Sequence, residues 1–214
     1  MIKAVIFDLD GVIVESEDAH IQAEKQTLRK YRVNISTEEL HKFTGTTAKA
    51  FFTEIIGKNK LNTTFEEINN QKEEILLKLL GQDAEPTHGV LNLIQKLRQR
   101  GIKLAIASSS TRRLVDYVLK KMNITRLFDC VVVAEDVEFS KPDPEIFLKA
   151  AKKLAISPSH CLVIEDAKLG VEAAKRAGMK CIGFRNPHSG NQDLSKADII
   201  TDDFSRMDIE KILA

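Results

Sequence analysis

Short apolar runs that alternate with helical patterns constrain the fold of this chain most strongly. The runs are apolar at nearly every position, which is typical of strands buried on both faces of a sheet. From residue 103 onward they alternate with helical patterns, which favours a parallel sheet with crossover helices. The predicted strands are Ala4–Phe7, Lys103–Ala107, Cys130–Val133, Cys161–Ile164 and Cys181–Phe184, with Asp198–Thr201 as a weaker sixth.

The helical patterns between these runs have recognisable ends. Residues 89–100 place four apolar side chains on one face, and we expect that helix to end at Gly101. Asp143 and Pro144 are expected to be the N-cap and the first residue of another helix, because proline is tolerated there. Residues 186–196 are polar and are predicted to form a surface loop.

Residues 15–85 have a different pattern, in which no strand-like run occurs. The capping-box sequences Ser36-x-x-Glu39 and Thr64-x-x-Glu67 predict helix starts. Since about 70 residues are too many for a simple crossover, we expect a helical domain inserted after the first strand. The fold class is therefore α/β, with a Rossmann-like core of residues 1–14 and 86–214 and a helical cap of residues 15–85.

The charge balance excludes two classes of partner. The 214 residues include 32 Lys and Arg against 31 Asp and Glu, a net charge of +1, so no broad field would attract nucleic acid or an anionic membrane.

Asp8 and Asp10 lie where a signal peptide needs an uncharged core, and no apolar run approaches the ~20 residues of a membrane span. We expect a cytoplasmic protein, and a monomer because no apolar surface stripe is evident.

The cysteines point to the same compartment. Cys130, Cys161 and Cys181 are odd in number and lack the CxxC spacing of metal sites. Two of them lie within apolar strand-like runs. We therefore expect buried thiols in a reducing compartment rather than a disulfide or a metal site.

Polar side chains follow four of the predicted strands. They are Asp8 and Asp10 after the first strand, Ser108, Ser109 and Ser110 after the second, Lys141 beyond the third, and Glu165 and Asp166 after the fourth. Each alone is equally consistent with a turn or a helix cap. Because ligands bind outside the carboxyl ends of parallel strands, we expect these groups to line one crevice.

This set of residues predicts a Mg²⁺ and phosphate site. Clustered carboxylates repel one another unless a hard cation lies among them, and Mg²⁺ takes oxygen ligands while keeping positions for substrate phosphate. Alternation along the strand end turns Asp8 and Asp10 to the same side. One can attack phosphorus while the other handles the proton, and Gly11 permits a close backbone approach.

Together these residues resemble the four motifs of the haloacid dehalogenase superfamily, in the same order and over essentially the whole chain. The matching residues are Asp8-Leu9-Asp10-Gly11-Val12, Ser108 after an apolar strand, Lys141-Pro142, and Glu165-Asp166. More narrowly, the chain is similar to the β-phosphoglucomutase-like and sugar-phosphatase branch, which inserts a helical cap between the first and second motifs.

The resemblance implies roles for the carboxylates. Asp8 would be the nucleophile and a Mg²⁺ ligand, and Asp10 the general acid/base that also gives Mg²⁺ its backbone carbonyl. Asp166, with Glu165 beside it, would complete the metal site. Asp10 also argues against hydrolysis of carbon–halogen bonds, since a halide leaving group needs no proton.

The resemblance implies further roles for the phosphate-binding groups. Ser108 and the N–H of Ser109 would hold the phosphoryl oxygens, and Lys141 would neutralise charge on the phosphoryl group and the nucleophile.

The resemblance also implies that the cap selects the substrate. The candidate contacts are His20 on the first cap helix, Gly45, Thr46 and Thr47 in a loop similar to the specificity loop, Lys49 and Lys78, and Ser110 and Arg112 from the core. His20 is equally consistent with an exposed position on an amphipathic helix, and Arg112 with the start of a solvated helix.

Two departures separate this chain from the mutases it resembles. Ala48 stands where they have an arginine for the second phosphate, and the ammonium of Lys49, one residue later on a helix, does not replace a bidentate guanidinium. Ala167 stands where they have serine, so Glu165-Asp166-Ala167 is closer to the sugar-phosphate and glycerol-phosphate phosphatases.

The leading hypothesis is a Mg²⁺-dependent phosphatase that acts on sugar or polyol phosphates through a phospho-Asp8 intermediate. The first alternative is a phosphomutase, which returns the phosphoryl group to another hydroxyl of the sugar. The second is a non-catalytic binding protein of the same fold. Loss of one motif residue would have indicated the latter, and all of them are present.

Overall fold

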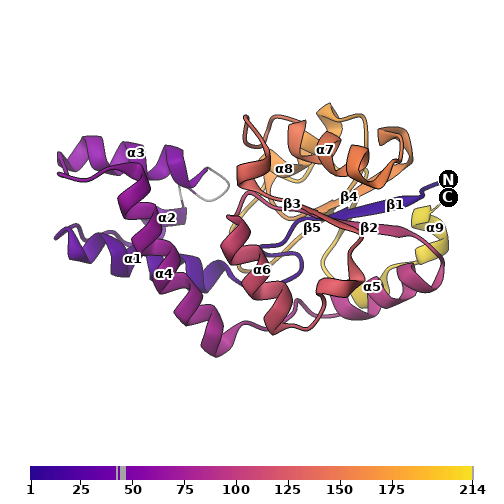
Figure 1. Ribbon diagram of the computed structural model, residues 1–214, viewed down its shortest axis with the longest axis horizontal. Coiled ribbons are helices and arrows are strands. Elements are labelled where there is room, and N and C mark those ends of the chain that lie inside the picture. Colours follow the sequence, from indigo (N-terminus) through magenta and orange to yellow (C-terminus); the bar gives the residue numbers. More distant parts are fainter. Residues whose placement is uncertain (42, 44–46, 214) are drawn as a thin grey trace. The chain divides into compact units, whose positions relative to one another are not determined.

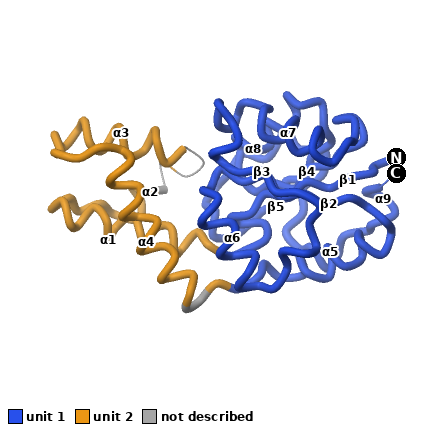
Figure 2. The backbone as a smooth tube through the Cα atoms, viewed as in Figure 1, with its two compact units in different colours: residues 1–15, 85–214 blue, residues 16–84 orange. Residues whose placement is uncertain are grey.

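The computed structural model describes residues 1–41, 43 and 47–213. The chain forms two compact units, which have different colours in Figure 2. We call residues 1–15 and 85–214 the core unit, and residues 16–84 the helical unit.

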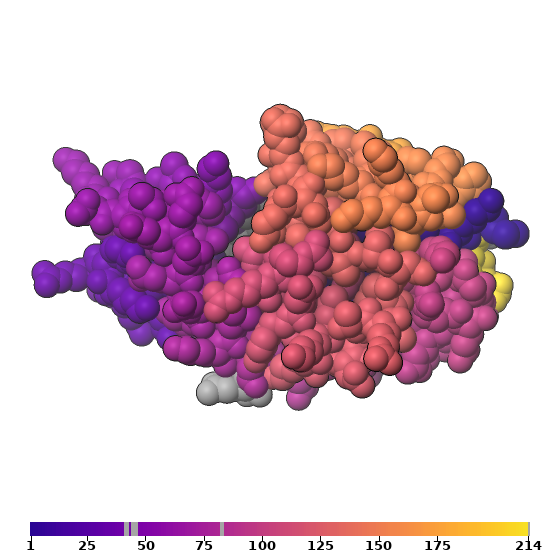
Figure 3. Space-filling model, in the orientation of Figure 1, coloured from indigo at the N-terminus to yellow at the C-terminus, as the bar shows by residue number. Residues whose placement is uncertain are grey.

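The core unit is built on a sheet of six strands in the order β3-β2-β1-β4-β5-β6. All neighbouring strands are parallel, so the prediction of a parallel α/β sheet is confirmed. β1 lies inside the sheet and is fully buried. In the space-filling view, indigo atoms of the first residues are visible at one end of the core unit, near yellow atoms of the last residues (Figure 3). The strands are β1 (Ala4–Phe7), β2 (Lys103–Ala107), β3 (Cys130–Val132), β4 (Cys161–Glu165), β5 (Lys180–Phe184) and β6 (Ile199–Thr201).

Helices cover both faces of this sheet. In Figure 1, α7 and α8 lie on one face and α5 and α6 on the other, as right-handed crossovers between parallel strands require. The helices of the core unit are α5 (Val90–Gln99), α6 (Arg112–Lys121), α7 (Glu145–Leu154), α8 (Lys168–Arg176) and α9 (Ile209–Leu213), with 3₁₀ turns at Thr125–Leu127, Ala134–Asp136, Pro158–His160 and Phe204–Arg206. Among all helices in the described part of the chain, none combines the length and hydropathy needed to cross a membrane.

The predicted helix ends lie within a residue or two of the observed ones. α7 starts at Glu145 rather than at Pro144, which is the cap residue, and the carboxylate of Asp143 accepts the N–H of Glu145 at 2.9 Å. The helix expected over residues 89–100 is α5, and Gly101 follows it with a φ of +70°. Glycine adopts this left-handed conformation without strain, and a left-handed residue just past the last turn ends the helix.

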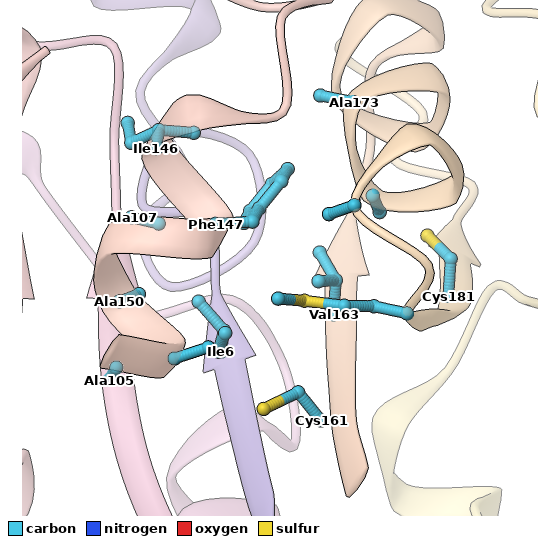
Figure 4. Close-up of a cluster of buried hydrophobic side chains, with 14 of the residues drawn as sticks. Ile6, Ala105, Ala107, Ile146, Phe147, Ala150, Cys161, Val163, Ala173 and Cys181 are labelled. Carbon is cyan, nitrogen blue, oxygen red and sulfur yellow. The ribbon is translucent and has the colours of Figure 1, made fainter. Parts of the chain in front are cut away.

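The face of the sheet beneath α7 and α8 packs into a hydrophobic core. Ile6 of β1, Phe147 of α7 and Val163 of β4 lie together in this core (Figure 4). Ala105 and Ala107 of β2 belong to the same cluster, and their small side chains let α7 approach closely. Burial of each large apolar side chain stabilises the fold by about 1.5–3 kcal/mol.

The three cysteines are free thiols. Cys161 and Cys181 are buried in the core as predicted, and burial raises the pKa of Cys161 to about 11 and the pKa of Cys181 further above its usual range. Cys130 is only half-buried, because β3 is an edge strand, so the prediction of a buried thiol is wrong for this residue.

The described residues of the helical unit form helices joined by turns, and both predicted capping boxes are present. The hydroxyl of Thr64 accepts the N–H of Glu67 at 3.2 Å, and the Glu67 carboxylate accepts the N–H of Thr64 at 3.0 Å; Ser36 and Glu39 make the same pair of bonds. The helices are α1 (Glu17–Lys30), α2 (Thr37–His41), α3 (Ala48–Asn59) and α4 (Phe65–Asp83). Their apolar core contains Leu28, Leu40, Phe51, Phe52, Ile55 and Ile68.

The segments that lead into and out of the helical unit run side by side within the core unit. Val14 and Pro86 form an antiparallel bridge. The N–H of Glu15 donates to the carbonyl of Glu85 at 3.1 Å. The chain therefore leaves and re-enters the core unit at adjacent backbone positions.

Candidate active site

The carboxyl ends of three neighbouring strands carry the polar residues singled out from the sequence. Asp8 follows β1, Ser108 follows β2, and β4 ends at Glu165. The N–H of Asp8 donates to the carbonyl of Ile164 at 3.0 Å, which continues the strand pairing to the first carboxylate. Because the three strands are adjacent and parallel, their ends reach the same edge of the sheet.

Lys141 joins two of these carboxylates. Its Nζ lies 2.5 Å from Oδ1 of Asp8 and 2.6 Å from Oε1 of Glu165, and it donates to the carbonyl of Ala107 at 3.2 Å. The ammonium also lies 5.1 Å from the centroid of the Phe147 ring, a favourable position for a cation. Lys141 is 9% exposed, so these charge-assisted bonds form away from bulk water.

Asp8, Glu165 and Asp166 form a buried carboxylate cluster. Each contributes an oxygen atom, and these oxygen atoms lie within 4.8 Å of one another. Burial raises the pKa of Asp8 to about 8; Lys141 opposes this shift, whereas the charges of Glu165 and Asp10 add to it. Burial alone would lower the pKa of Lys141, but Asp8 and Glu165 hold it above its usual range. The cluster thus has more negative charge than one ammonium balances.

Two glycines bring the backbone close to this cluster. Gly11 has a φ of +73°, and a Cβ at that position would lie 2.1 Å from Oδ2 of Asp166. A Cβ on Gly170 of α8 would lie 1.8 Å from Oε1 of Glu165. Side chains at either position would displace a carboxylate. The donor set consists of oxygen atoms and carries excess negative charge, so the residues present fit a hard divalent cation such as Mg²⁺.

The second aspartate of the first motif contacts the loop after β2. The hydroxyl of Ser110 donates to Oδ2 of Asp10 at 2.7 Å, and the N–H of Ser110 donates to the hydroxyl of Ser108 at 3.0 Å. Ser108 is buried, whereas Ser109 is exposed. Ser110, expected to contact substrate, therefore orients the carboxylate of Asp10 in this structure.

Arg112 lies in an ion pair within the core unit. Its guanidinium is 2.8 Å from Oδ2 of Asp136, and its backbone N–H donates to the carboxylate of Glu135 at 3.0 Å. These bonds tie the start of α6 to the 3₁₀ turn after β3. Nothing in the sequence pattern pointed to these partners, because the residues are separated by more than twenty positions.

His20 in the helical unit has a charged neighbour that the sequence did not suggest. Nδ1 of His20 lies 2.7 Å from Nζ of Lys72, which links α1 to α4. His20 is half-buried and Lys72 is buried, so His20 is not the exposed helix position that was one of the alternatives.

The other described candidates of the helical unit are one helix cap and two exposed side chains. Thr47 is the N-cap of α3 and accepts the N–H of Ala50 at 3.1 Å. Lys49 and Lys78 are exposed on α3 and α4. Gly45 and Thr46 lie outside the described residues.

The segment after β5 contains two polar residues that the sequence pattern did not single out. Asn186 and Ser189 are 3% and 4% exposed, so the prediction of a surface loop is wrong at these positions. Ser189 donates to the carboxylate of Asp166, and Asn186 donates to the carbonyl of Gly11 at 2.9 Å. Their position just after a strand of the sheet was the one available signal.

Comparison with known proteins identifies the family that shares this arrangement. A family model described as "Haloacid dehalogenase-like hydrolase" matches residues 5–184. YhcW of Bacillus subtilis, named as a phosphatase, is 34% identical over 100% of this chain and 97% of its own length. The phosphorylated carbohydrates phosphatase of Thermotoga maritima is 30% identical over 84% of this chain and 83% of its own.

Mutases and solved structures are also similar to the chain. The β-phosphoglucomutase of Bacillus subtilis is 31% identical over 97% of this chain and 92% of its own. The crystal structure of CbbY from Rhodobacter sphaeroides in complex with phosphate has a TM-score of 0.89 and 25% identity, covering 96% of both chains.

Proposed function

The chain belongs to the haloacid dehalogenase-like hydrolases, and within this family we propose that it is a Mg²⁺-dependent phosphatase of sugar or polyol phosphates that works through a phosphorylated Asp8. It is an enzyme of the phosphatase or phosphomutase class, as its named relatives are. The observation that supports the proposal best is the buried cluster of Asp8, Glu165 and Asp166 with Lys141 between two of its members.

In the first step, Asp8 attacks the phosphorus of the substrate. An Asp8–phosphorus bond forms while the bond from phosphorus to the substrate oxygen breaks, and the leaving alkoxide takes a proton from Asp10. Lys141, 2.5 Å from Oδ1 of Asp8, balances charge on the nucleophile and the phosphoryl oxygens. Ser108 and the N–H of Ser109 bind those oxygens.

In the second step, Asp10 accepts a proton from the water that attacks the phosphorylated Asp8. The new oxygen–phosphorus bond replaces the Asp8–phosphorus bond, which releases phosphate, restores the carboxylate of Asp8 and leaves Asp10 protonated for the next cycle. The hydroxyl of Ser110, 2.7 Å from Oδ2 of Asp10, keeps this carboxylate at the site.

Asp8, the backbone carbonyl of Asp10, and Asp166 with Glu165 beside it would hold the Mg²⁺ ion. When bound, the ion supplies positive charge that stabilises the transferring phosphoryl oxygens. The excess negative charge of the buried cluster supports this assignment.

We assign substrate selection to the helical unit. Its candidates are His20, Thr47 and Lys49, with Gly45 and Thr46 outside the described residues. Lys78 and Arg112 are further candidates, although Arg112 is engaged by Asp136 at 2.8 Å. The proposed substrates are small phosphorylated molecules. A net charge of only +1 supports the absence of nucleic-acid and membrane partners, and we keep the expectation of a cytoplasmic monomer.

A phosphomutase is the second candidate, supported by the 31% identity to a β-phosphoglucomutase over 97% of this chain. Ala48 and Ala167 argue against it, because neither can make the polar contacts that arginine and serine make at those positions in the mutases. The product separates the two candidates. A phosphatase releases inorganic phosphate, whereas a mutase isomerises the sugar phosphate and needs a bisphosphate primer.

The test is a phosphate-release screen over sugar, polyol and nucleotide monophosphates, with Mg²⁺ and with a chelator. We expect Mg²⁺-dependent release that falls by about 10³-fold or more in Asp8→Asn, since an amide cannot serve as the nucleophile. Asp202→Asn is the matched control, because Asp202 is an exposed aspartate that directly follows β6. Full activity in Asp8→Asn would exclude the phospho-Asp8 mechanism, and isomerisation of glucose 1-phosphate without phosphate release would favour the mutase.

A further inference from the structure

The segment after β5, which follows the recognised motifs in the chain, reaches the carboxylate cluster through Ser189. The hydroxyl of Ser189 donates a hydrogen bond to Oδ2 of Asp166, and the two side chains are buried, with exposed fractions of 4% and 6%. A buried hydroxyl that donates to a carboxylate fixes the orientation of that carboxylate.

Asn186 fixes the turn that presents this hydroxyl. Its Oδ1 accepts the N–H of His188 at 2.8 Å, and its backbone carbonyl accepts the N–H of Ser189 at 3.3 Å. Its Nδ2 donates to the carbonyl of Gly11 at 2.9 Å and to Oε2 of Glu15 at 3.0 Å. One side chain therefore ties the turn after β5 to the turn after β1.

Close packing makes the orientation of Asp166 sensitive to these contacts. Gly11 leaves room for Oδ2 of Asp166, since a Cβ there would lie 2.1 Å away, and the same Cβ would lie 3.1 Å from Oγ of Ser189. The backbone of Gly11 is in turn held by Asn186. Ser189 thus holds the carboxylate by a hydrogen bond, and the lack of a side chain at Gly11 leaves the space that the carboxylate occupies.

We propose that Ser189 is a positioning residue for Asp166, that Asn186 positions Ser189, and that this pair determines the affinity of the carboxylate cluster for a divalent cation. The inference rests on the proposed function only in taking the cluster as the cation site. Hydrogen bonds to ligating carboxylates are conserved design features of metal sites, and their loss costs about 10–100-fold in metal affinity.

The experiment measures binding of Mg²⁺ and Mn²⁺ to the metal-free full chain by calorimetry. Ser189→Ala is expected to raise the dissociation constant by about 10-fold or more, and Ser189→Thr, which keeps the hydroxyl, to recover most of the affinity. Ser195→Ala is the matched control, because Ser195 is an exposed serine of the same loop whose side chain bonds the carboxylate of Asp193, away from the cluster. Melting temperatures in a chelator report folding independently of metal.

A dissociation constant for Ser189→Ala within about twofold of the wild-type value would overturn the proposal, as would an equal loss in Ser195→Ala. If Ser189→Ala does not fold, Asn186→Ala decides, since it removes the support of Ser189 without touching Asp166, and unchanged affinity in that variant overturns the proposal. A wild-type chain that binds neither cation would instead contradict the Mg²⁺ requirement of the proposed function.

Discussion

In the core unit, polar side chains from distant parts of the sequence meet at one edge of a sheet, whereas in the helical unit the candidates His20, Lys49 and Lys78 come from three different helices. Lys141 is 133 positions from Asp8 and yet 2.5 Å from its carboxylate. In the helical unit, Lys49 and Lys78 are exposed on different helices. A parallel sheet concentrates charge at strand ends, so the core unit buries three carboxylates and one ammonium at a single edge.

The largest change in stability between the two units is expected from Lys141→Met. The variant leaves Asp8 and Glu165 buried without their shared ammonium, and we expect the free energy of unfolding to fall by about 3 kcal/mol at pH 8 in a chelator. Lys78→Met, at an exposed lysine of the helical unit, is the control and should change it by less than about 0.5 kcal/mol. Urea unfolding measures both, and equal effects would end the contrast between the units.

A pH effect of intermediate size should come from Asp8. Its pKa is about 8 in the folded chain and near 3.8 otherwise, so the folded state holds a proton that the unfolded state releases. Stability without metal should therefore be full below about pH 4 and decline as the pH rises toward 8, by roughly 2 kcal/mol between pH 5.5 and 7.5.

Asp8→Asn removes this titration, so the decline with pH should be absent in that variant. Saturating Mg²⁺ should also reduce the loss of stability with rising pH in the wild-type chain, because a cation favours the ionised carboxylate. Unfolding free energies in urea across the pH range provide the measurement. An identical slope in Asp8→Asn and in the wild type would assign the effect to other groups.

The smallest effects should come from two glycines, one in a helix of each unit. Gly170→Ala places a Cβ against Glu165 and should destabilise the chain by about 1–2 kcal/mol and weaken Mg²⁺ binding. Gly57→Ala in α3 has open space within 4 Å and should stabilise it by about 0.5–1 kcal/mol. Thermal melts and calorimetry distinguish the signs, and two changes of the same sign would show that the two helices pack alike.

The strands were predictable because burial on both faces leaves a continuous apolar pattern. All six predicted strands are present, and β1 and β2 have the predicted ends. The capping boxes at Ser36 and Thr64 were predictable for a similar reason, since each depends on residues three positions apart.

Other contacts could not be predicted, because nothing periodic encodes them. Asn186 bonds Gly11 across 175 positions, and its polar neighbours favour a surface loop. The bond of Arg112 to Asp136 and that of His20 to Lys72 depend on side-chain directions that emerge only after packing. The motif residues Asp8, Lys141 and Glu165 lie together, while their catalytic roles stay predictions.

The two chain segments that meet at Glu15 and Glu85 have an evolutionary consequence. Since both junctions of the insertion start from neighbouring backbone positions, an ancestral core could gain, lose or exchange such a module without shifting the strand ends that carry its acids. Under the function proposed above, selection on substrate recognition would thereby be separated from selection on phosphoryl transfer. Proteins built on this plan would then differ in the inserted unit while the carboxylate cluster of the core stays the same.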